Sequence, residues 1–237
     1  MQNAKAMLRQ IPGFSAAGRL VRSYGLRSQS TEQVFTDIFQ SNSWRGSQSV
    51  SGCGSDDDQT ALLKTVLPGL FAELGIDSIL DIPCGDFHWM QDLDLATIDY
   101  CGADIVSDLV ASNNDQFGGD SVRFLQKDLI RDSLPQVDLL LCRDCLVHLS
   151  ATDIRSALKN ICDSGATYLL TTTFSARTKN IDIATGQWRP VNLELSPFDL
   201  PAPMRLINEG CTESNGEFAD KALGLWRLAD LKDCLAG

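Results

Sequence analysis

Several patterns that would settle the class of this protein at once are missing from its sequence. No run approaches the about 20 consecutive apolar residues that a membrane-spanning helix needs. The amino-terminal part also lacks the continuous apolar core of a secretory signal. With 43% hydrophobic and 22% charged residues, the composition is that of a soluble globular protein. We therefore expect a cytoplasmic protein that does not cross a membrane.

Cysteine and histidine do not occur in a metal-binding or disulfide pattern. The chain has eight cysteines and two histidines. Cys142 and Cys145 form a CxxC pair, but no second pair accompanies it and only His148 stands at ligand spacing, so we expect neither structural zinc nor a redox motif. Several cysteines lie inside apolar, strand-like runs, where a free thiol acts as a small hydrophobe. This usage indicates a reducing compartment.

Acidic residues are absent from the first 30 positions. The bases there are Lys5, Arg9, Arg19, Arg22 and Arg27. The rest of the chain holds 15 of the 20 bases and all 31 acids, a balance that should repel nucleic acid. Three interpretations of the basic segment stay open: an amphipathic contact with a partner or with the inner face of the membrane, an acid-poor transit peptide, or a packed helix. We expect 1–30 to be a basic segment and 31–237 a single domain.

Hydrophobic periodicity predicts alternating helices and strands, without an internal repeat. Helices are predicted at 30–39, 59–74, 87–93, 107–113 and 150–165, and strands at 78–81, 100–105, 122–125, 137–143, 168–173, 204–207 and 224–228. Pro68 should kink or divide the second helix. Near-continuous apolar strands indicate a parallel sheet covered on both faces, and the last two strands predict an antiparallel pair at one edge. We expect a doubly wound, Rossmann-like α/β fold with a seven-stranded sheet.

Acidic residues end the first two strands and follow the third. Asp81 leads into a tight turn at Pro83 and Gly85, which places free backbone N–H groups beside a carboxylate. Asp104 stands where an acid accepts hydrogen bonds from ribose hydroxyls; the alternative is that it merely caps the next helix. Asp128 would line the same cleft. No GxGxxG follows the first strand, which disfavours a nicotinamide-dependent oxidoreductase but leaves it as an alternative.

Together these motifs resemble those of class I S-adenosylmethionine-dependent methyltransferases. The order SILDIPCG, GADI, QKDLI and VDLLLCRDCLVHLS is similar to that family's acidic turn, ribose-binding acid, adenine-side acid and catalytic segment. More narrowly, SVSGCGSD, DIPCGDFHWM, CRDCLVHLS, TTTF and NEGCTESNGEFADKALGLWRL resemble a bacterial and viral group associated with glycan genes. The resemblance covers about residues 31–237 and implies S-adenosylmethionine as cofactor and a glycan or small molecule as methyl acceptor.

The resemblance also implies the cofactor-binding residues. At the methionine portion these are Asp81, Pro83, Cys84 and Gly85, at the nucleoside Asp104, Ile105, Asp128 and Leu129, and at the tip of the fourth strand Arg143. The loop residues expected to close over the cofactor carboxylate or the substrate are Ser51, Gly52 and Ser55. Pro83 and Phe87 stand where the family usually has the first and last glycine, so the turn differs at the methionine end.

Methylation of an oxygen needs a base, and His148 is the best candidate because its ordinary pKa suits proton transfer. Asp144 would orient His148, act itself as base, or hold a metal. The alternative is that His148 only packs against the next helix. His88 is expected to shape the cofactor pocket. A methyltransferase-like binding module without turnover also remains an alternative.

Polar and aromatic residues in the late loops are the expected acceptor contacts. They are Trp188, Arg189, Asn208, Glu209, Asn215 and Asp220, together with Trp44. Indole faces and hydrogen-bonding side chains suit a sugar, but they also suit ordinary loop packing. Trp44 lies in a loop rich in Ser, Gly and Asp that is either a flexible linker or ordered around a ligand.

Overall fold

The computed structural model describes residues 25–26 and 28–235. Most of the basic segment expected at 1–30 therefore lies outside the described residues. Within the described part, no helix combines the length and the apolar character needed to cross a membrane.

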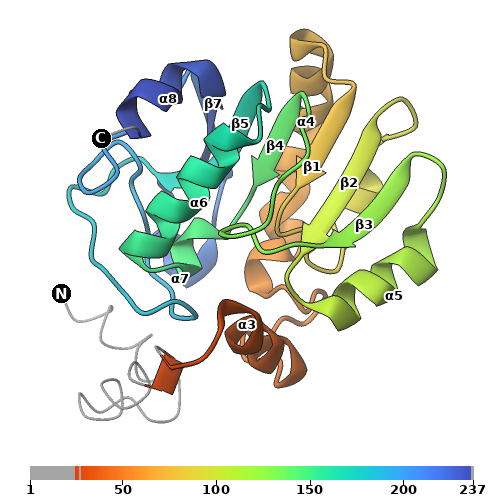
Figure 1. Ribbon diagram of the computed structural model, residues 1–237, viewed down its shortest axis with the longest axis horizontal. Coiled ribbons are helices and arrows are strands. Elements are labelled where there is room, and N and C mark those ends of the chain that lie inside the picture. The colour runs from red at the N-terminus through yellow and green to blue at the C-terminus, as the bar shows by residue number, and fades with distance from the viewer. Residues whose placement is uncertain (1–24, 27, 236–237) are drawn as a thin grey trace.

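A seven-stranded mixed sheet forms the centre of the fold (Figure 1). Its order is β3-β2-β1-β4-β5-β7-β6. The strands are β1 (Ser78–Asp81), β2 (Asp99–Asp104), β3 (Val122–Gln126), β4 (Leu139–Cys142), β5 (Tyr168–Phe174), β6 (Arg205–Asn208) and β7 (Lys221–Arg227). The first five strands pair in parallel, whereas β7 is antiparallel to both β5 and β6. The predicted fold class, including the antiparallel pair at one edge, is confirmed.

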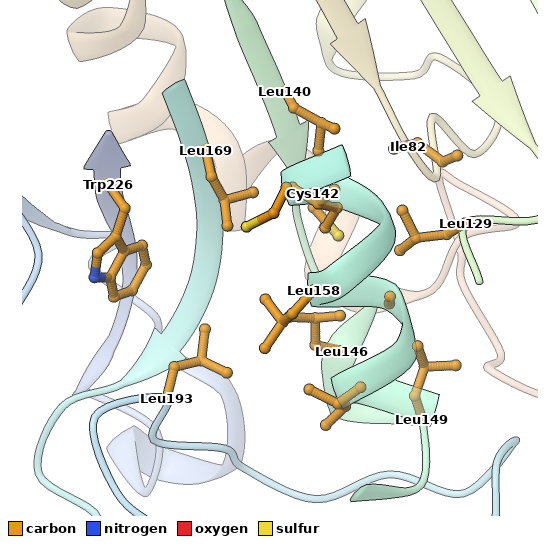
Figure 2. Close-up of a cluster of buried hydrophobic side chains, with 14 of the residues drawn as sticks. Ile82, Leu129, Leu140, Cys142, Leu146, Leu149, Leu158, Leu169, Leu193 and Trp226 are labelled. Carbon is orange, nitrogen blue, oxygen red and sulfur yellow. The ribbon is translucent and has the colours of Figure 1, made fainter. Parts of the chain in front are cut away.

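Helices cover both faces of the sheet, as Figure 1 shows with α6 in front and α4 behind. The helices are α3 (Thr31–Gln40), α4 (Asp57–Leu74), α5 (Ser107–Phe117), α6 (Ala151–Asp163), the short turn α7 (Glu213–Gly216) and α8 (Leu228–Leu235). Successive residues of β1 point to opposite sides, so Ile79 packs with α4 and Leu80 packs with α6. Figure 2 shows the α6 side, where Leu158 lies among Leu146, Leu149 and Leu169. Parallel strands buried on both faces explain the continuous apolar runs.

Local signals place most helix ends correctly. Ser30 and Ser150 cap α3 and α6 by accepting hydrogen bonds from the N–H groups of Gln33 and Asp153, and Gly75 ends α4 in the left-handed conformation at φ 64°. Such side-chain caps satisfy N–H groups that lack a partner within the helix.

Three local predictions are wrong: the division of the second helix at Pro68, the helix at 87–93, and the start of the last strand. Pro68 lies inside one helix, α4, and does not divide it, because Leu67, Leu70 and Phe71 on both sides of it are buried against the sheet. The segment predicted as a helix at 87–93 is a series of turns with one 3₁₀ turn, η2 (Met90–Asp92). Phe87 has φ 58°, which a continuous right-handed helix excludes. The last strand begins at Lys221, three residues before the prediction.

Candidate active site

A hollow lies at the carboxyl-terminal edge of the parallel strands, where α3 crosses the strand ends. It encloses about 1140 Å³ of empty space, part of it open to solvent. Its lining includes every predicted cofactor-binding residue except Gly52, both predicted catalytic residues, and Trp44. Segments far apart in the sequence therefore meet at one place. Among the described residues, no group of three His, Cys, Asp or Glu side chains is arranged to hold a metal ion.

The turn after β1 carries a buried carboxylate. Asp81 accepts a hydrogen bond of 2.6 Å from the hydroxyl of Tyr100. Burial raises the pKa of Asp81 to about 7, although this hydrogen bond and Arg143 act in the opposite direction. Asp81 is therefore an acid that changes charge near neutral pH, and a cation bound beside it would favour the ionised form.

Asp104 at the tip of β2 ties this turn to the next strand. One carboxylate oxygen accepts from the N–H of Val106 at 3.0 Å and the other from the N–H of Gly85 at 3.3 Å. Burial raises the pKa of Asp104 to about 6. Val106 precedes α5, which begins at Ser107 and has no side-chain cap, so Asp104 does not cap this helix as the alternative interpretation expected. A carboxylate has about four acceptor sites. Because Asp104 lines the hollow, its remaining acceptor sites can face a ligand hydroxyl.

The loop rich in Ser, Gly and Asp is ordered against the β1 turn. Asp86 accepts hydrogen bonds from the hydroxyl of Ser49 at 2.8 Å and from the N–H of Val50 at 2.9 Å. Gly85 has φ 56°, and a Cβ there would lie 2.1 Å from the hydroxyl oxygen of Ser51. Only glycine fits both the conformation and this close approach. This loop therefore packs against the β1 turn and does not stand apart as a separate linker.

Four charged groups form a cluster at the wall of the hollow, and three of them are buried. Arg143 donates to Glu209 at 2.7 and 2.9 Å and to the carbonyl oxygen of Gly54 at 2.8 Å. Lys221 lies 2.6 Å from Asp144 and 3.5 Å from Glu209. The side chains of Arg143 and Lys221 are each 5% exposed and that of Glu209 is 1% exposed. Burial raises the pKa of Asp144, but Lys221 and Arg143 outweigh it and lower this pKa to about 2.

Replacing Lys221 with methionine should lower the free energy of unfolding by about 3–5 kcal/mol, because breaking a buried ion pair leaves its acidic partners uncompensated. The matched change Lys159→Met on the solvent-facing side of α6, where Lys159 pairs with Asp163, should cost less than about 1 kcal/mol. Urea unfolding followed by tryptophan fluorescence measures both. Equal losses at the two positions would show that the buried cluster contributes little.

His148 stands at the end of η3 (Leu146–His148), the 3₁₀ turn after β4. Its Nδ1 lies 3.1 Å from the carbonyl oxygen of Gln187. Because a carbonyl only accepts, Nδ1 carries the proton and Nε2 presents a lone pair. Burial lowers the pKa of His148 to about 4, so the ring is neutral at ordinary pH. The ring of Trp44 packs against it at 4.8 Å between centroids.

The orientation of His148 thus comes from Gln187 and Trp44, and no hydrogen bond joins its ring to Asp144 among the described residues. Asp144 instead receives a hydrogen bond from Lys221. Its φ of 53° is uncommon for a residue other than glycine and accompanies a side chain that is 27% exposed and lines the hollow.

Of the predicted acceptor residues, only Trp44 lines the hollow. The indole of Trp188 packs against Phe174 and Phe218. Arg189 donates to the carbonyl oxygens of Leu146 and Leu149 and so supports η3 from behind. The remaining contacts are Asn208 to Ala219, Glu209 to Arg143, and Asp220 to Arg177, whereas Asn215 lies in a turn at φ 57°. Direct contact of these residues with an acceptor stays a prediction.

Several lining residues were not assigned to the site from the sequence. Among them are Thr31, Phe35 and Phe39 from α3, and Asp86 and Trp89 from the β1 turn. The periodicity of α3 identified its buried stripe, Val34 and Ile38, but not the target of the adjacent aromatic face. Asp86 was visible in the sequence only as part of DIPCGDF.

Comparison with solved structures defines the architecture. Human N-acetylserotonin methyltransferase in complex with S-adenosylmethionine superposes with a TM-score of 0.57 at 15% identity over 84% of this chain. The fold is that of class I methyltransferases. The N-methyltransferase NodS from Bradyrhizobium japonicum superposes with a TM-score of 0.54 at 13% identity, covering 73% of this chain and 97% of NodS.

The chain spans 60% of the length of the human enzyme. No family model matches the chain, and no curated protein matches it. The two structural neighbours carry different names, one of them specifying transfer to nitrogen, so the fold alone leaves the acceptor atom open.

Proposed function

We propose that this protein transfers the methyl group of S-adenosylmethionine to an oxygen atom of a small-molecule or glycan acceptor. The observation that carries the proposal is that one hollow joins the acidic tips of β1 and β2 to the neutral ring of His148. S-adenosylmethionine supplies a methyl group activated by a sulfonium. What an oxygen acceptor still requires is removal of its proton, and the free Nε2 of His148 provides a base for this step.

The residues of the hollow fit this cofactor. Asp104 has acceptor sites beyond its two backbone contacts and would hold the ribose hydroxyls. Ile105, Asp128 and Leu129 would border the adenine, and α3 would cover it through Phe35 and Phe39. Asp81 and the turn through Pro83, Cys84 and Gly85 would face the methionine portion, with Ser51 and Ser55 closing over it. Arg143 would act mainly through the charge cluster.

Calorimetry with purified protein tests the cofactor assignment. S-adenosylmethionine and its demethylated product, S-adenosylhomocysteine, should both give a saturable heat, whereas NAD should give none. Mass spectrometry of a candidate glycan or a cell extract, with and without protein, then looks for an added methyl group. Absence of a heat for both adenosyl compounds would exclude the proposed function.

Binding of S-adenosylmethionine should strengthen as pH rises from about 5.5 to 7. The pKa of Asp81 is raised to about 7, so below that pH the carboxyl group is protonated and must lose its proton to pair with the cationic methionine portion. The dissociation constant should fall by roughly tenfold per pH unit where Asp81 is mostly protonated. Asp104, with its pKa raised to about 6, adds to the slope below pH 6.

Titrations in two buffers of different ionisation enthalpy measure this effect, because binding at pH 6 should release protons. In Asp81→Asn the dependence between pH 6 and 7 should disappear. An affinity that is constant, or that weakens as pH rises over this range, would show that Asp81 does not face the cofactor's positive charge.

A further inference from the structure

Two titratable side chains, His148 and Asp144, lie at one end of the hollow, and both have acceptor atoms available for a hydrogen bond. His148 uses Nδ1–H for the carbonyl oxygen of Gln187, which leaves the lone pair of Nε2. Asp144 is an ionised carboxylate whose side chain is 27% exposed. One of its oxygens has only a long contact of 3.4 Å, from the hydroxyl of Thr172. Both side chains line the same hollow.

The cations next to Asp144 have few donors left for a ligand. Arg143 commits Nε and Nη2 to Glu209 and Gly54, and its Nη1 lies 3.5 Å from Asp144. Lys221 is 5% exposed and directs its ammonium to Asp144. A ligand group at this end must therefore supply hydrogen-bond donors, because a ligand acceptor would be repelled by the acceptor atoms of His148 and Asp144.

Charge favours neutral donors over an ammonium group. Arg143 and Lys221 both lie within ion-pair distance of Asp144, while Glu209 and the more distant Glu213 supply the other negative charges around Arg143. Asp144 therefore needs no further counterion, yet its carboxylate still has free acceptor sites. A hydroxyl satisfies these sites without adding charge beside a cationic cofactor.

The shape of the wall indicates what carries the hydroxyl groups. Trp44 packs on the ring of His148 at 4.8 Å, and Phe35 packs on Trp44 at 6.3 Å between ring centroids. The carbon skeleton next to a hydroxyl at His148 thus meets an aromatic surface, which suits a ring better than an extended polar chain.

We propose that the acceptor is a ring bearing two adjacent hydroxyl groups, one at Nε2 of His148 and the other hydrogen-bonded to Asp144. This inference rests on the proposed function. The first hydroxyl is methylated: its oxygen bonds to the methyl carbon as the sulfur–methyl bond breaks with its electron pair left on sulfur. The hydroxyl proton passes to Nε2 and then to solvent. The second hydroxyl stays unmodified and determines which oxygen lies in line with the sulfur–methyl bond.

Matched pairs of small ligands test the proposal with the full chain saturated with S-adenosylhomocysteine. The pairs are catechol against phenol, and cis- and trans-cyclohexane-1,2-diol against cyclohexanol. At least one diol should bind about tenfold or more tightly than its mono-ol, as measured by ligand-observed NMR titration, because a second hydrogen bond reaches a charged acceptor. Equal affinities within each pair, or no binding by any diol up to its solubility limit, would overturn it.

The carboxylate of Glu213 also approaches Gly54 beside the cluster, and a further negative charge would favour a cationic ligand. 2-Aminocyclohexanol, which carries an ammonium group at neutral pH, therefore completes the panel. Tighter binding of this amino alcohol than of the diols would overturn the choice of a neutral donor. Asp144→Asn should remove the advantage of the diol, whereas Asp163→Asn at the exposed end of α6 should keep it. If Asp144→Asn does not fold, the wild-type comparison still decides. Failure to bind S-adenosylhomocysteine would reject the proposed function itself, and normal binding without a diol advantage would reject only this inference.

Discussion

Replacing His148 with glutamine should lower kcat by about 10²–10⁴-fold, the usual contribution of a general base, while the dissociation constant of S-adenosylhomocysteine changes by less than about threefold. The reason is that the free Nε2 is the proposed proton acceptor. A second signature concerns pH. Because burial lowers the pKa of His148 to about 4, kcat of the wild-type protein should stay constant above about pH 5.5, without the inflection near 6.5 that an ordinary histidine gives.

The chain offers a matched control, since His88 is the only other histidine. It does not line the hollow and lies 3.7 Å from Asp57 at the start of α4. His88→Gln should retain kcat within about threefold. Methyl transfer by His148→Gln at the wild-type rate would show that Nε2 is not the base and that His148 has only a packing role.

Replacing Asp104 with asparagine should weaken binding of S-adenosylhomocysteine by about 100-fold. Hydrogen bonds to a charged acceptor contribute about 1.5–3 kcal/mol each, and Asp104 is proposed to receive them from the ribose. In the native protein the N–H groups of Gly85 and Val106 each donate to one oxygen of Asp104. The NH₂ group of asparagine would face one of these two N–H groups, so two donors would oppose each other. Calorimetric titration measures the loss, and thermal unfolding shows whether the variant is folded.

Asp99 at the opposite end of β2 provides the control. It pairs with Arg123 on the surface and lies outside the hollow. Asp99→Asn should bind S-adenosylhomocysteine like the wild type. A loss of less than about threefold in Asp104→Asn would identify Asp104 as a structural residue that only ties Gly85 and Val106 together.

The strands whose carboxyl-terminal ends border the hollow could be predicted because their signals are local. β1 and β4 are short apolar runs that end at a proline turn and at Arg143 respectively, and a parallel sheet brings such ends to one edge. The acids Asp81 and Asp104 follow from this geometry with no further information. Ser30 and Ser150 likewise determine where α3 and α6 begin through contacts within one turn.

The acceptor side could not be predicted in the same way, because it depends on contacts between distant loops. Trp188 and Arg189 are adjacent in sequence, yet one side chain packs against Phe218 and the other is buried beneath η3. No periodic pattern in a loop distinguishes these directions from a ligand contact. Lys221 could not be identified from the sequence for another reason. Its role depends on strand pairing that places it opposite Phe174 and beside Asp144.

The reversed direction of β7 brings its first residue to the edge of the sheet that borders the hollow. Among the described strands, β6 pairs only with β7, so it cannot join the sheet until β7 has inserted beside β5. Because β7 runs against the other strands, the same insertion delivers Lys221, at its first position, to the edge where they end. The pairing of β7 thus completes the sheet and also supplies the cation that pairs with Asp144. A chain that ended before β7 would lack both β7 and the partner of Asp144.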